Sequence, residues 1–203
     1  MKIIGITGGI GCGKSQLLAL FDNREGVTVC SADQIGKELQ ARGQAAYAPI
    51  LEAFGTDYCL PDGELDRKAL AERVFGDEKA LSELNAIVHP LVHEEVLRRI
   101  SSAREQGDKL FLLESAILLD VGYQTFCEEV WALRASAATR KRRLKEQRGM
   151  DEADVERIMI RQRSDEAYAA ECDRIIDNDG GLDELKDQVN RLLSSLGLDD
   201  RRI

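Results

Sequence analysis

The chain has 203 residues, of which 43% are hydrophobic and 32% are charged, so its composition is that of a folded globular protein and excludes a disordered or fibrous one. No apolar run approaches the roughly 20 residues that span a bilayer, and the short apolar stretch at the N-terminus has no secretory cleavage site. The formal net charge of −9 disfavours non-specific binding to nucleic acid or to an anionic membrane. We therefore expect a cytoplasmic protein with no nucleic-acid and no membrane partner.

Five scattered cysteines, with no C-x-x-C pair, argue against a disulfide framework and against a structural zinc site, as expected in a reducing compartment. Short apolar runs predict five buried strands, at residues 2–7, 27–30, 109–114, 129–133 and 174–176. Helical patterns lie between these strands. This alternation predicts an α/β fold with a parallel sheet that helices cover on both faces.

A glycine-rich loop follows the first predicted strand. Gly8–Ser15 reads GGIGCGKS and matches G-x-x-x-x-G-K-[ST], with a strand before it and a helix after it. Such a loop points its backbone N–H groups at phosphates, the lysine adds a positive charge for the β- and γ-phosphates, and the final hydroxyl suits Mg²⁺. We interpret Cys12 as a small side chain beside glycines and not as a reactive thiol. The sequence thus predicts binding of ATP and Mg²⁺, with Ser15 as the metal ligand and with nucleotide contacts from Gly9, Ile10, Gly11, Cys12, Gly13, Lys14, Ser15 and Gln16.

Asp33 follows the second predicted strand, at the edge of a parallel sheet where ligands bind. Its carboxylate can accept a proton from an attacking hydroxyl. It can equally serve as the N-cap of the helix that follows. Residue spacing alone leaves these two hypotheses open.

The interval between the second and third strands is far longer than one crossover helix requires. Its pattern predicts helices at 33–42, 44–54, 67–75 and 78–88, with Asp66 and Asp77 as caps of the last two, and a further helix that begins at Pro90 and ends near residue 104. We interpret this interval as a helical lobe that holds an acceptor substrate. Because Pro90 separates the last two predicted helices, we do not pair His89 with His93 as metal ligands; a lone histidine is more often a helix-end or core residue.

Glu114 ends the third predicted strand. In P-loop proteins an acidic group at this position approaches the Mg²⁺ shell, although aspartate is commoner there. The alternative is a simple strand-terminal cap, and we favour the functional hypothesis.

A basic segment follows the fourth predicted strand. Residues 140–148 read RKRRLKEQR, with six basic residues and one acidic residue. Ser136 is expected to cap a helix that ends at Gly149, and Asp151 to cap a second helix that ends near residue 163. A charged helix face is usually only solvated, but acidic partners are sparse in this segment, which favours an anionic ligand. A mobile arginine that closes over a transferring phosphoryl group would have this character. The last predicted helix, 182–196, is amphipathic and is expected to pack on the sheet.

The ordered motifs resemble those of the dephospho-CoA kinase family. The similarity runs from IIGITGGIGCGKS at the start, through SAD, GELDRKALAERVF, the Ile87-Val88-His89-Pro90 stretch, LLESAILLDVGY, RLKEQRG and the Arg157–Gln162 segment, to RIIDNDG. The P-loop alone is shared by many families, whereas LDR followed by HP and then IIDN is much more specific. The chain departs from the family pattern at Ser31, where an acid is usual, at Gln16, where threonine is usual, and at Ser115-Ala116, where proline is common.

The resemblance implies a three-layer P-loop NTPase fold with strand order 2-3-1-4-5, in one domain that covers 1–203. It implies three subregions: a core at about 1–32, 108–135 and 172–203, a helical CoA lobe at about 33–107, and a lid at about 136–171. It also implies transfer of the ATP γ-phosphoryl group to the 3′-hydroxyl of dephospho-CoA. We expect a monomer or weak homo-oligomer. A kinase for another small acceptor, such as a nucleoside monophosphate, and a nucleotide-dependent switch are the alternatives.

Individual roles also follow from the resemblance. Asp33 is expected to be the catalytic base, and Lys14 is expected to hold charge during phosphoryl transfer. The remaining positions that the resemblance implies are Thr7, Arg67, His89 and Glu114 on the acceptor side, Arg140, Arg143 and Arg148 in the lid, and Asn178 near the adenine of ATP.

Overall fold

The computed structural model describes residues 1–198, which form two compact units. The first unit comprises Met1–Cys30 and the described residues from Ser102, and the second comprises Ser31–Ser101. Within the described residues no helix is long and apolar enough to cross a membrane. That the core, the lobe and the lid have distinct functions stays a prediction.

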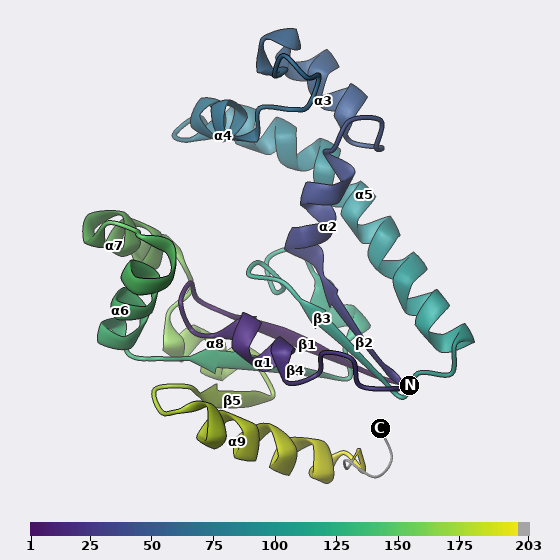
Figure 1. Ribbon diagram of the computed structural model, residues 1–203, viewed down its shortest axis with the longest axis vertical. Coiled ribbons are helices and arrows are strands. Elements are labelled where there is room, and N and C mark those ends of the chain that lie inside the picture. Colours follow the sequence, from purple (N-terminus) through teal and green to yellow (C-terminus); the bar gives the residue numbers. More distant parts are fainter. Residues whose placement is uncertain (199–203) are drawn as a thin grey trace. The chain divides into compact units, whose positions relative to one another are not determined.

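The first unit is built on a five-stranded sheet in the order β2-β3-β1-β4-β5 (Figure 1). The central strand β1 pairs in parallel with β3 and with β4, which places Ile6 opposite both Glu114 and Trp131. The predicted strands and their order are confirmed. Their bounds are β1 Lys2–Gly8, β2 Val27–Ser31, β3 Leu110–Glu114, β4 Glu129–Arg134 and β5 Arg174–Asp177.

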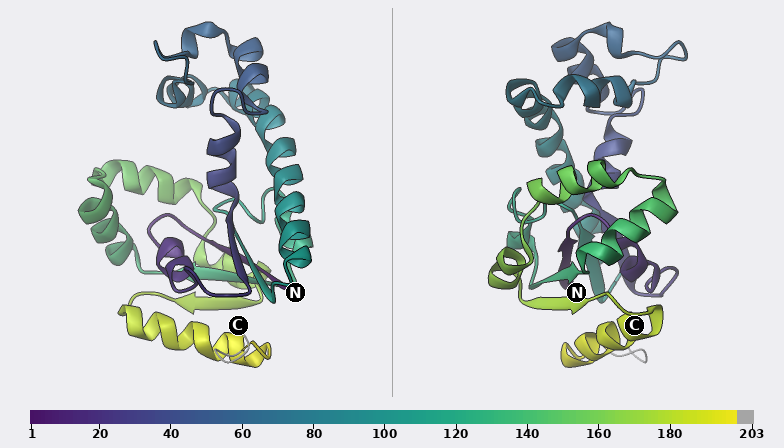
Figure 2. Two further views of the ribbon diagram at one scale, coloured as in Figure 1. Left: turned by 45° about the vertical axis from the view of Figure 1, so that its right-hand side comes forward. Right: turned by 90° about the vertical axis from the view of Figure 1, so that its left-hand side faces the viewer.

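Helices α1 (Lys14–Ala19) and α9 (Leu182–Ser195) share one hydrophobic core with the sheet. This core includes Ile4, Leu17 and Trp131, each at most 1% exposed. Figure 2 shows α9 running alongside β5, so the predicted packing of the last helix on the sheet is confirmed. On Gly5 an added Cβ would lie 2.9 Å from side-chain atoms of Leu118 and Cys127, which shows that the segment after β3, with its 3₁₀ helix Tyr123–Phe126, packs directly on β1.

Three helices lie between β4 and β5: α6 (Ala137–Arg148), α7 (Glu152–Arg161) and α8 (Asp165–Glu171). The predicted caps are confirmed, because the side chains of Ser136 and Asp151 accept backbone hydrogen bonds and Gly149, at φ 62°, ends α6. The predicted second helix, to about residue 163, is confirmed as α7, which ends at Arg161. The short helix α8 was not predicted, and the hydroxyl of Ser164 caps it.

The second unit is helical. It contains α2 (Ala32–Leu39), α3 (Tyr47–Phe54), the 3₁₀ helix Thr56–Tyr58, α4 (Arg67–Val74) and most of α5 (Glu78–Glu105). Helices α2 and α3 are shorter than predicted. The predicted caps are confirmed, since Asp66 Oδ1 accepts a hydrogen bond from Ala69 N at 2.9 Å and Asp77 Oδ1 accepts one from Ala80 N at 3.0 Å. The core side chains of this unit include Ile35, Ile50, Leu70, Val88, Val92 and Val96.

Helix α2 is capped by Ser31 and not by Asp33. The Ser31 hydroxyl accepts a hydrogen bond from Gln34 N at 3.3 Å, and Asp33 lies in the first turn with its side chain exposed. The hypothesis that Asp33 is the N-cap is therefore wrong. The capping residue is the serine that replaces the usual first acid of this motif.

Helix α5 runs without interruption through Pro90, so the prediction of two helices with a start at Pro90 is wrong. Proline lacks the N–H that would bond to the carbonyl four residues back, and its ring crowds that carbonyl. A buried stripe that includes Val88, Val92 and Val96 continues on both sides of the proline, and packing of this stripe outweighs the local cost. His89 and His93 therefore lie one turn apart on a continuous helix, yet within residues 1–198 no group of three His, Cys, Asp or Glu side chains is placed to hold a metal ion.

The position of Pro90 predicts that its removal stabilises the fold. Alanine restores an N–H donor inside α5 and relieves the crowding, so Pro90→Ala should raise the free energy of unfolding by about 1–3 kcal/mol. Urea denaturation measures this change. The control Ser82→Ala, at another exposed position of α5, should stay within about 0.5 kcal/mol of the parent protein; a loss of stability in Pro90→Ala would contradict the expectation.

Candidate active site

The glycine-rich loop joins the buried end of β1 to α1. Gly8, Gly11 and Gly13 have φ values of 136°, 77° and 97°, which side-chain-bearing residues rarely adopt. Lys14 lies at the first position of α1, and its ammonium donates a hydrogen bond to Gly8 O at 2.8 Å. Ser15 follows with its side chain exposed. The loop therefore has the strand, turn and helix N-terminus that bind phosphate groups in P-loops.

Two of these glycines have no room for a side chain. On Gly8 an added Cβ would lie 2.4 Å from Leu133 O of β4, and on Gly13 it would lie 2.0 Å from Asn178 Nδ2. Asn178, which is 2% exposed at the end of β5, donates hydrogen bonds to Cys12 O at 2.8 Å and to Gln16 Oε1 at 3.3 Å. The resemblance implies that Asn178 lies near the adenine of ATP. In the structure its carboxamide binds the backbone of the loop.

Helix α6 contacts the other side of the loop. Arg140, which is 8% exposed, donates from Nε to Ile10 O at 2.8 Å and from Nη2 to Gln162 Oε1 at 3.2 Å. Gln162, just after α7, also accepts a hydrogen bond from Ile10 N at 2.8 Å. Gln162 ends a segment that resembles the family, but the sequence assigns it no role, because its loop partner lies 152 residues away.

Cys12 is 1% exposed within the loop. Burial raises the pKa of its thiol, and the smaller effect of the Arg140 charge lowers it. A buried thiol with a raised pKa is a poor nucleophile, which agrees with its interpretation as a small packing residue.

The cations of α6 differ in their surroundings. Lys141 makes ion pairs with Glu152 and Glu156 of α7, so part of the repulsion in the basic segment is relieved inside the protein. Arg143 and Arg148 make no ion pair within the described part of the chain, and Arg143 Nη1 is buried without a hydrogen-bond partner there. A buried donor without an acceptor is costly, so the position of Arg143 favours an anionic ligand.

Asp179 anchors the start of α6 to the end of β5. Its carboxylate accepts hydrogen bonds from Ser136 N at 2.9 Å and from Ser136 Oγ at 2.8 Å. The hydrogen bonds from Ser136, with smaller contributions from Thr139 and Arg143, lower the pKa of Asp179. This residue was not predicted from the sequence, since its partner lies 43 positions away.

Two predicted acceptor-side residues, Thr7 and Glu114, lie at the adjacent carboxyl ends of β1 and β3. They are 1% and 8% exposed. Thr7 Oγ1 has no hydrogen-bond partner in the described residues, although the Tyr168 hydroxyl is close enough to interact with it. Burial raises the pKa of Tyr168, and this smaller interaction with Thr7 lowers it. The sheet edge therefore holds a buried hydroxyl that can bind a ligand.

The other predicted acceptor-side residues, Asp33, Arg67 and His89, lie in the second unit on α2, α4 and α5. Arg67 Nη1 donates to Lys37 O at 3.2 Å, at the last turn of α2. His89 is half-buried, and desolvation lowers its pKa, so the neutral imidazole is favoured. An unprotonated imidazole can accept a hydrogen bond from a hydroxyl.

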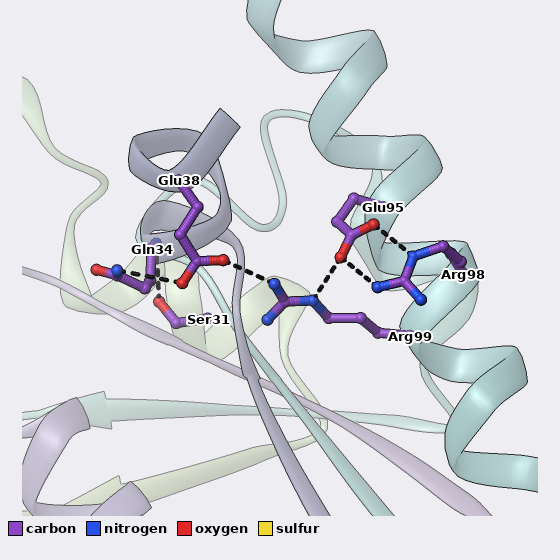
Figure 3. A network of polar contacts seen from close by, with 6 residues as sticks. All are labelled: Ser31, Gln34, Glu38, Glu95, Arg98 and Arg99. Atoms are coloured by element: carbon purple, nitrogen blue, oxygen red, sulfur yellow. Dashed lines mark hydrogen bonds and ion pairs between the residues drawn. The ribbon is translucent and has the colours of Figure 1, made fainter. Parts of the chain in front are cut away.

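A network of charged side chains ties α2, which carries Asp33, to α5 (Figure 3). Arg99 donates to Glu38 Oε2 of α2 at 2.7 Å and to Glu95 Oε1 at 2.8 Å, and Arg98 also binds Glu95. The hydrogen bonds from Arg98, followed by those from Arg99, lower the pKa of Glu95 to about 2, against the opposing effect of burial. The ionised Glu95 carboxylate therefore holds Arg99 beside α2.

The pKa of Glu95 predicts an acid-dependent contribution to stability. Its folded value of about 2 is below its ordinary value of 4.5, so the contribution is present above pH 4.5 and is lost as the pH falls toward 2. Glu95→Gln should cost about 1 kcal/mol at pH 6, with solvent screening taken into account, and almost nothing near pH 2. Urea unfolding across this range tests the expectation, with Glu94→Gln on the same helix as the control. A cost that does not vary with pH would contradict it.

The close approach at Gly13 predicts a large effect of one methyl group. Gly13→Ala adds a strained φ and forces Asn178 away, so it should cost about 3 kcal/mol of unfolding free energy. The matched control is Gly107→Ala, where φ is 82° and no atom lies within 4 Å of the added Cβ. This control should cost only about 1–2 kcal/mol. Equal costs in urea denaturation would show that Asn178 does not restrict this position.

Comparison with known proteins places this arrangement in a family. A family model described as dephospho-CoA kinase matches residues 2–184. A dephospho-CoA kinase from Corynebacterium glutamicum is 37% identical over 196 residues, which cover 97% of this chain and 98% of the relative.

Two solved structures share the fold. TT1252 from Thermus thermophilus superposes with a TM-score of 0.81 at 28% identity, over 96% of this chain and 97% of that one. Dephospho-CoA kinase from Campylobacter jejuni superposes with a TM-score of 0.71 at 20% identity, over 97% of this chain and 98% of that one. Because the family model and this relative both match nearly the whole chain, the chain belongs to the dephospho-CoA kinase family.

Proposed function

We propose that this protein transfers the γ-phosphoryl group of ATP to the 3′-hydroxyl of dephospho-CoA, which gives coenzyme A and ADP. The observation that carries this proposal is family membership over nearly the whole chain, because the similarity includes the acceptor-side segments as well as the P-loop. The geometry of the loop agrees with it, since Gly8–Ser15 joins a buried strand to a helix N-terminus.

On the donor side we propose that the loop amides, with Lys14, bind the ATP phosphates. Lys14 Nζ bonds to Gly8 O in the structure, and this weak carbonyl contact can be exchanged for a stronger one with a phosphate oxygen. Arg140 and Asn178 would complete the nucleotide site from α6 and β5. The proposed nucleotide contacts within the loop are Gly9, Ile10, Gly11, Cys12, Gly13, Lys14, Ser15 and Gln16.

The exposed Ser15 hydroxyl fits Mg²⁺, since it is a hard oxygen donor at the start of α1. We propose that it holds the ion that accompanies ATP. When bound, this ion would neutralise phosphate charge as it develops during transfer. Glu114 is an acidic neighbour on β3, and its substrate-side role stays a proposal.

On the acceptor side we propose Asp33 as the general base. Its carboxylate is exposed in the first turn of α2, and Ser31 already performs the capping that would otherwise account for an acid there. Asp33 would accept the proton of the attacking hydroxyl as the new P–O bond forms and the bond to ADP breaks. We propose that Thr7, Arg67, His89 and Glu114 contribute to acceptor binding.

The lid arginines would act on developing charge. We propose that Arg143 and Arg148 stabilise the equatorial oxygens of the transferring phosphoryl group. Within residues 1–198, Arg143 Nη1 is buried without a hydrogen-bond partner, which supports this role, whereas Lys141 is already paired with acids of α7. We also propose a cytoplasmic monomer or weak homo-oligomer without nucleic-acid or membrane partners, in keeping with the net charge of −9.

An assay of ADP release tests the acceptor. Dephospho-CoA should support turnover at least about 100-fold above the ATP-only background, whereas AMP and shikimate should not. Asp33→Asn should lower kcat by about 100-fold or more while ATP binding persists, because the hydroxyl loses its proton acceptor.

The control for Asp33 is Glu52→Gln, an exposed acid of α3. Its kcat should stay within about twofold of the parent protein. Turnover with another acceptor but not with dephospho-CoA would refute the proposed reaction. Unchanged kcat in Asp33→Asn would remove Asp33 from the role of base.

A further inference from the structure

The carboxamide of Gln162 lies between the P-loop backbone and the guanidinium of Arg140. Its Oε1 accepts hydrogen bonds from Ile10 N at 2.8 Å and from Arg140 Nη2 at 3.2 Å. Both partners are donors, so only the oxygen of the carboxamide can face them. The orientation of the side chain is therefore determined by its partners.

Arg140 closes a ring of hydrogen bonds around a single residue of the loop. Its Nε donates to Ile10 O at 2.8 Å, while Gln162 accepts from Ile10 N. We call Ile10, Arg140 and Gln162 the Ile10 clamp. The clamp holds the amide and the carbonyl of Ile10 at the same time, and it joins the loop to the helices that follow β4.

The clamp lies tightly against the loop. On Gly9 an added Cβ would lie 2.4 Å from Arg140 Nη2 and 3.1 Å from Gln162 Oε1. Glycine is thus required here to admit the clamp side chains, even though the φ of Gly9 is not in the left-handed region. A contact this close transmits any displacement of Arg140 to the loop backbone.

The hydrogen-bond acceptor that Gln162 offers to Arg140 is a neutral oxygen and not a carboxylate. Arg140 is 8% exposed, and it makes no ion pair with a carboxylate in the described part of the chain. Gln162 satisfies the guanidinium with a neutral oxygen, which leaves its positive charge uncompensated beside the loop. A carboxylate at this position would hold Arg140 equally well but would cancel the charge that attracts phosphates.

We propose that Gln162 is a positioning residue for phosphoryl transfer. It holds the Arg140 guanidinium and the Ile10 peptide in place, so that the charge of Arg140 and the following loop amides are directed at the ATP phosphates. This inference rests on the proposed ATP site at Gly8–Ser15. Gln162 acts through Arg140 and Ile10 and has no proposed contact with the transferred group.

Steady-state ADP release by the full-length protein tests the role of Gln162. Gln162→Met keeps the length of the side chain and removes its oxygen. It should lower kcat/KM for ATP by about 10- to 100-fold, the range for loss of a hydrogen bond to a charged group. KM for dephospho-CoA should change by less than about threefold, because the acceptor site is not altered.

A double-substitution cycle separates positioning from a structural contribution. Because Gln162 acts partly through Arg140, the loss of kcat/KM for ATP caused by Gln162→Met should be at least about threefold smaller in an Arg140→Met background than in the parent protein. Independent, multiplicative losses would overturn the proposal. So would an unchanged kcat/KM for ATP in Gln162→Met.

Two further variants distinguish a loss of positioning from a folding defect. Lys141→Met removes two ion pairs between α6 and α7 and leaves the clamp residues unchanged, so its kcat/KM for ATP should stay within about twofold of the parent protein. Should Gln162→Met fail to fold, Gln162→Asn keeps the carboxamide but shortens its reach. The same loss in kcat/KM for ATP is then expected, with KM for dephospho-CoA changed by less than about threefold, and an equal rise in KM for both substrates would overturn the proposal.

Failure of the clamp and failure of the proposed reaction give different results. If the parent protein releases no ADP in response to dephospho-CoA, the proposed reaction is refuted whatever Gln162 does. ATP titration by calorimetry then tests the clamp by itself. At least about a tenfold weaker Kd for ATP in Gln162→Met supports the proposal, and an equal Kd overturns it.

Discussion

The backbone conformation of the phosphate loop Gly8–Ser15 imposes the constraint on which the rest of this structure depends. A loop that turns its N–H groups toward a phosphate needs left-handed backbone and neighbours that approach without steric conflict. Here β4 meets the loop at Gly8 and Asn178 meets it at Gly13. Each neighbour excludes a side chain from the loop and supports its backbone. The sheet order places β4 and β5 on the same side of β1, beside the loop. The loop therefore needs glycine at these positions to admit its neighbours.

Charge is distributed according to the same requirement. The basic helix α6 lies against the loop, yet only Lys141 among its cations is paired with acids of α7. Arg140 is held by neutral oxygens, those of Ile10 and Gln162. This arrangement keeps positive charge available for an anion while the overall net charge is −9. The cost of burying a guanidinium is offset by hydrogen bonds that do not neutralise it.

The helical unit contains the acceptor-side residues in a different physical setting. Asp33 is exposed on α2, and the position of α2 is determined by its cap at Ser31 and by the pairing of Arg99 with Glu38. Ser31 stands where the family motif usually has an acid, and this difference has a structural consequence. It removes one acid, and its hydroxyl caps α2, so Asp33 has no capping role.

The sequence alone determined the strands, the phosphate loop, most of the helix caps and the family, because these depend on local periodicity, glycine placement and ordered motifs. Tertiary structure decided what local patterns could not. Packing of buried valines keeps α5 helical through Pro90, although proline locally disfavours the interior of a helix. Gln162 contacts Ile10 across 152 residues, and Asp179 contacts Ser136 across 43, so local patterns could not predict either contact. Local hydrogen-bonding and steric rules act over a few residues, whereas the position of a side chain against the loop is determined by the packing of the whole sheet and its helices.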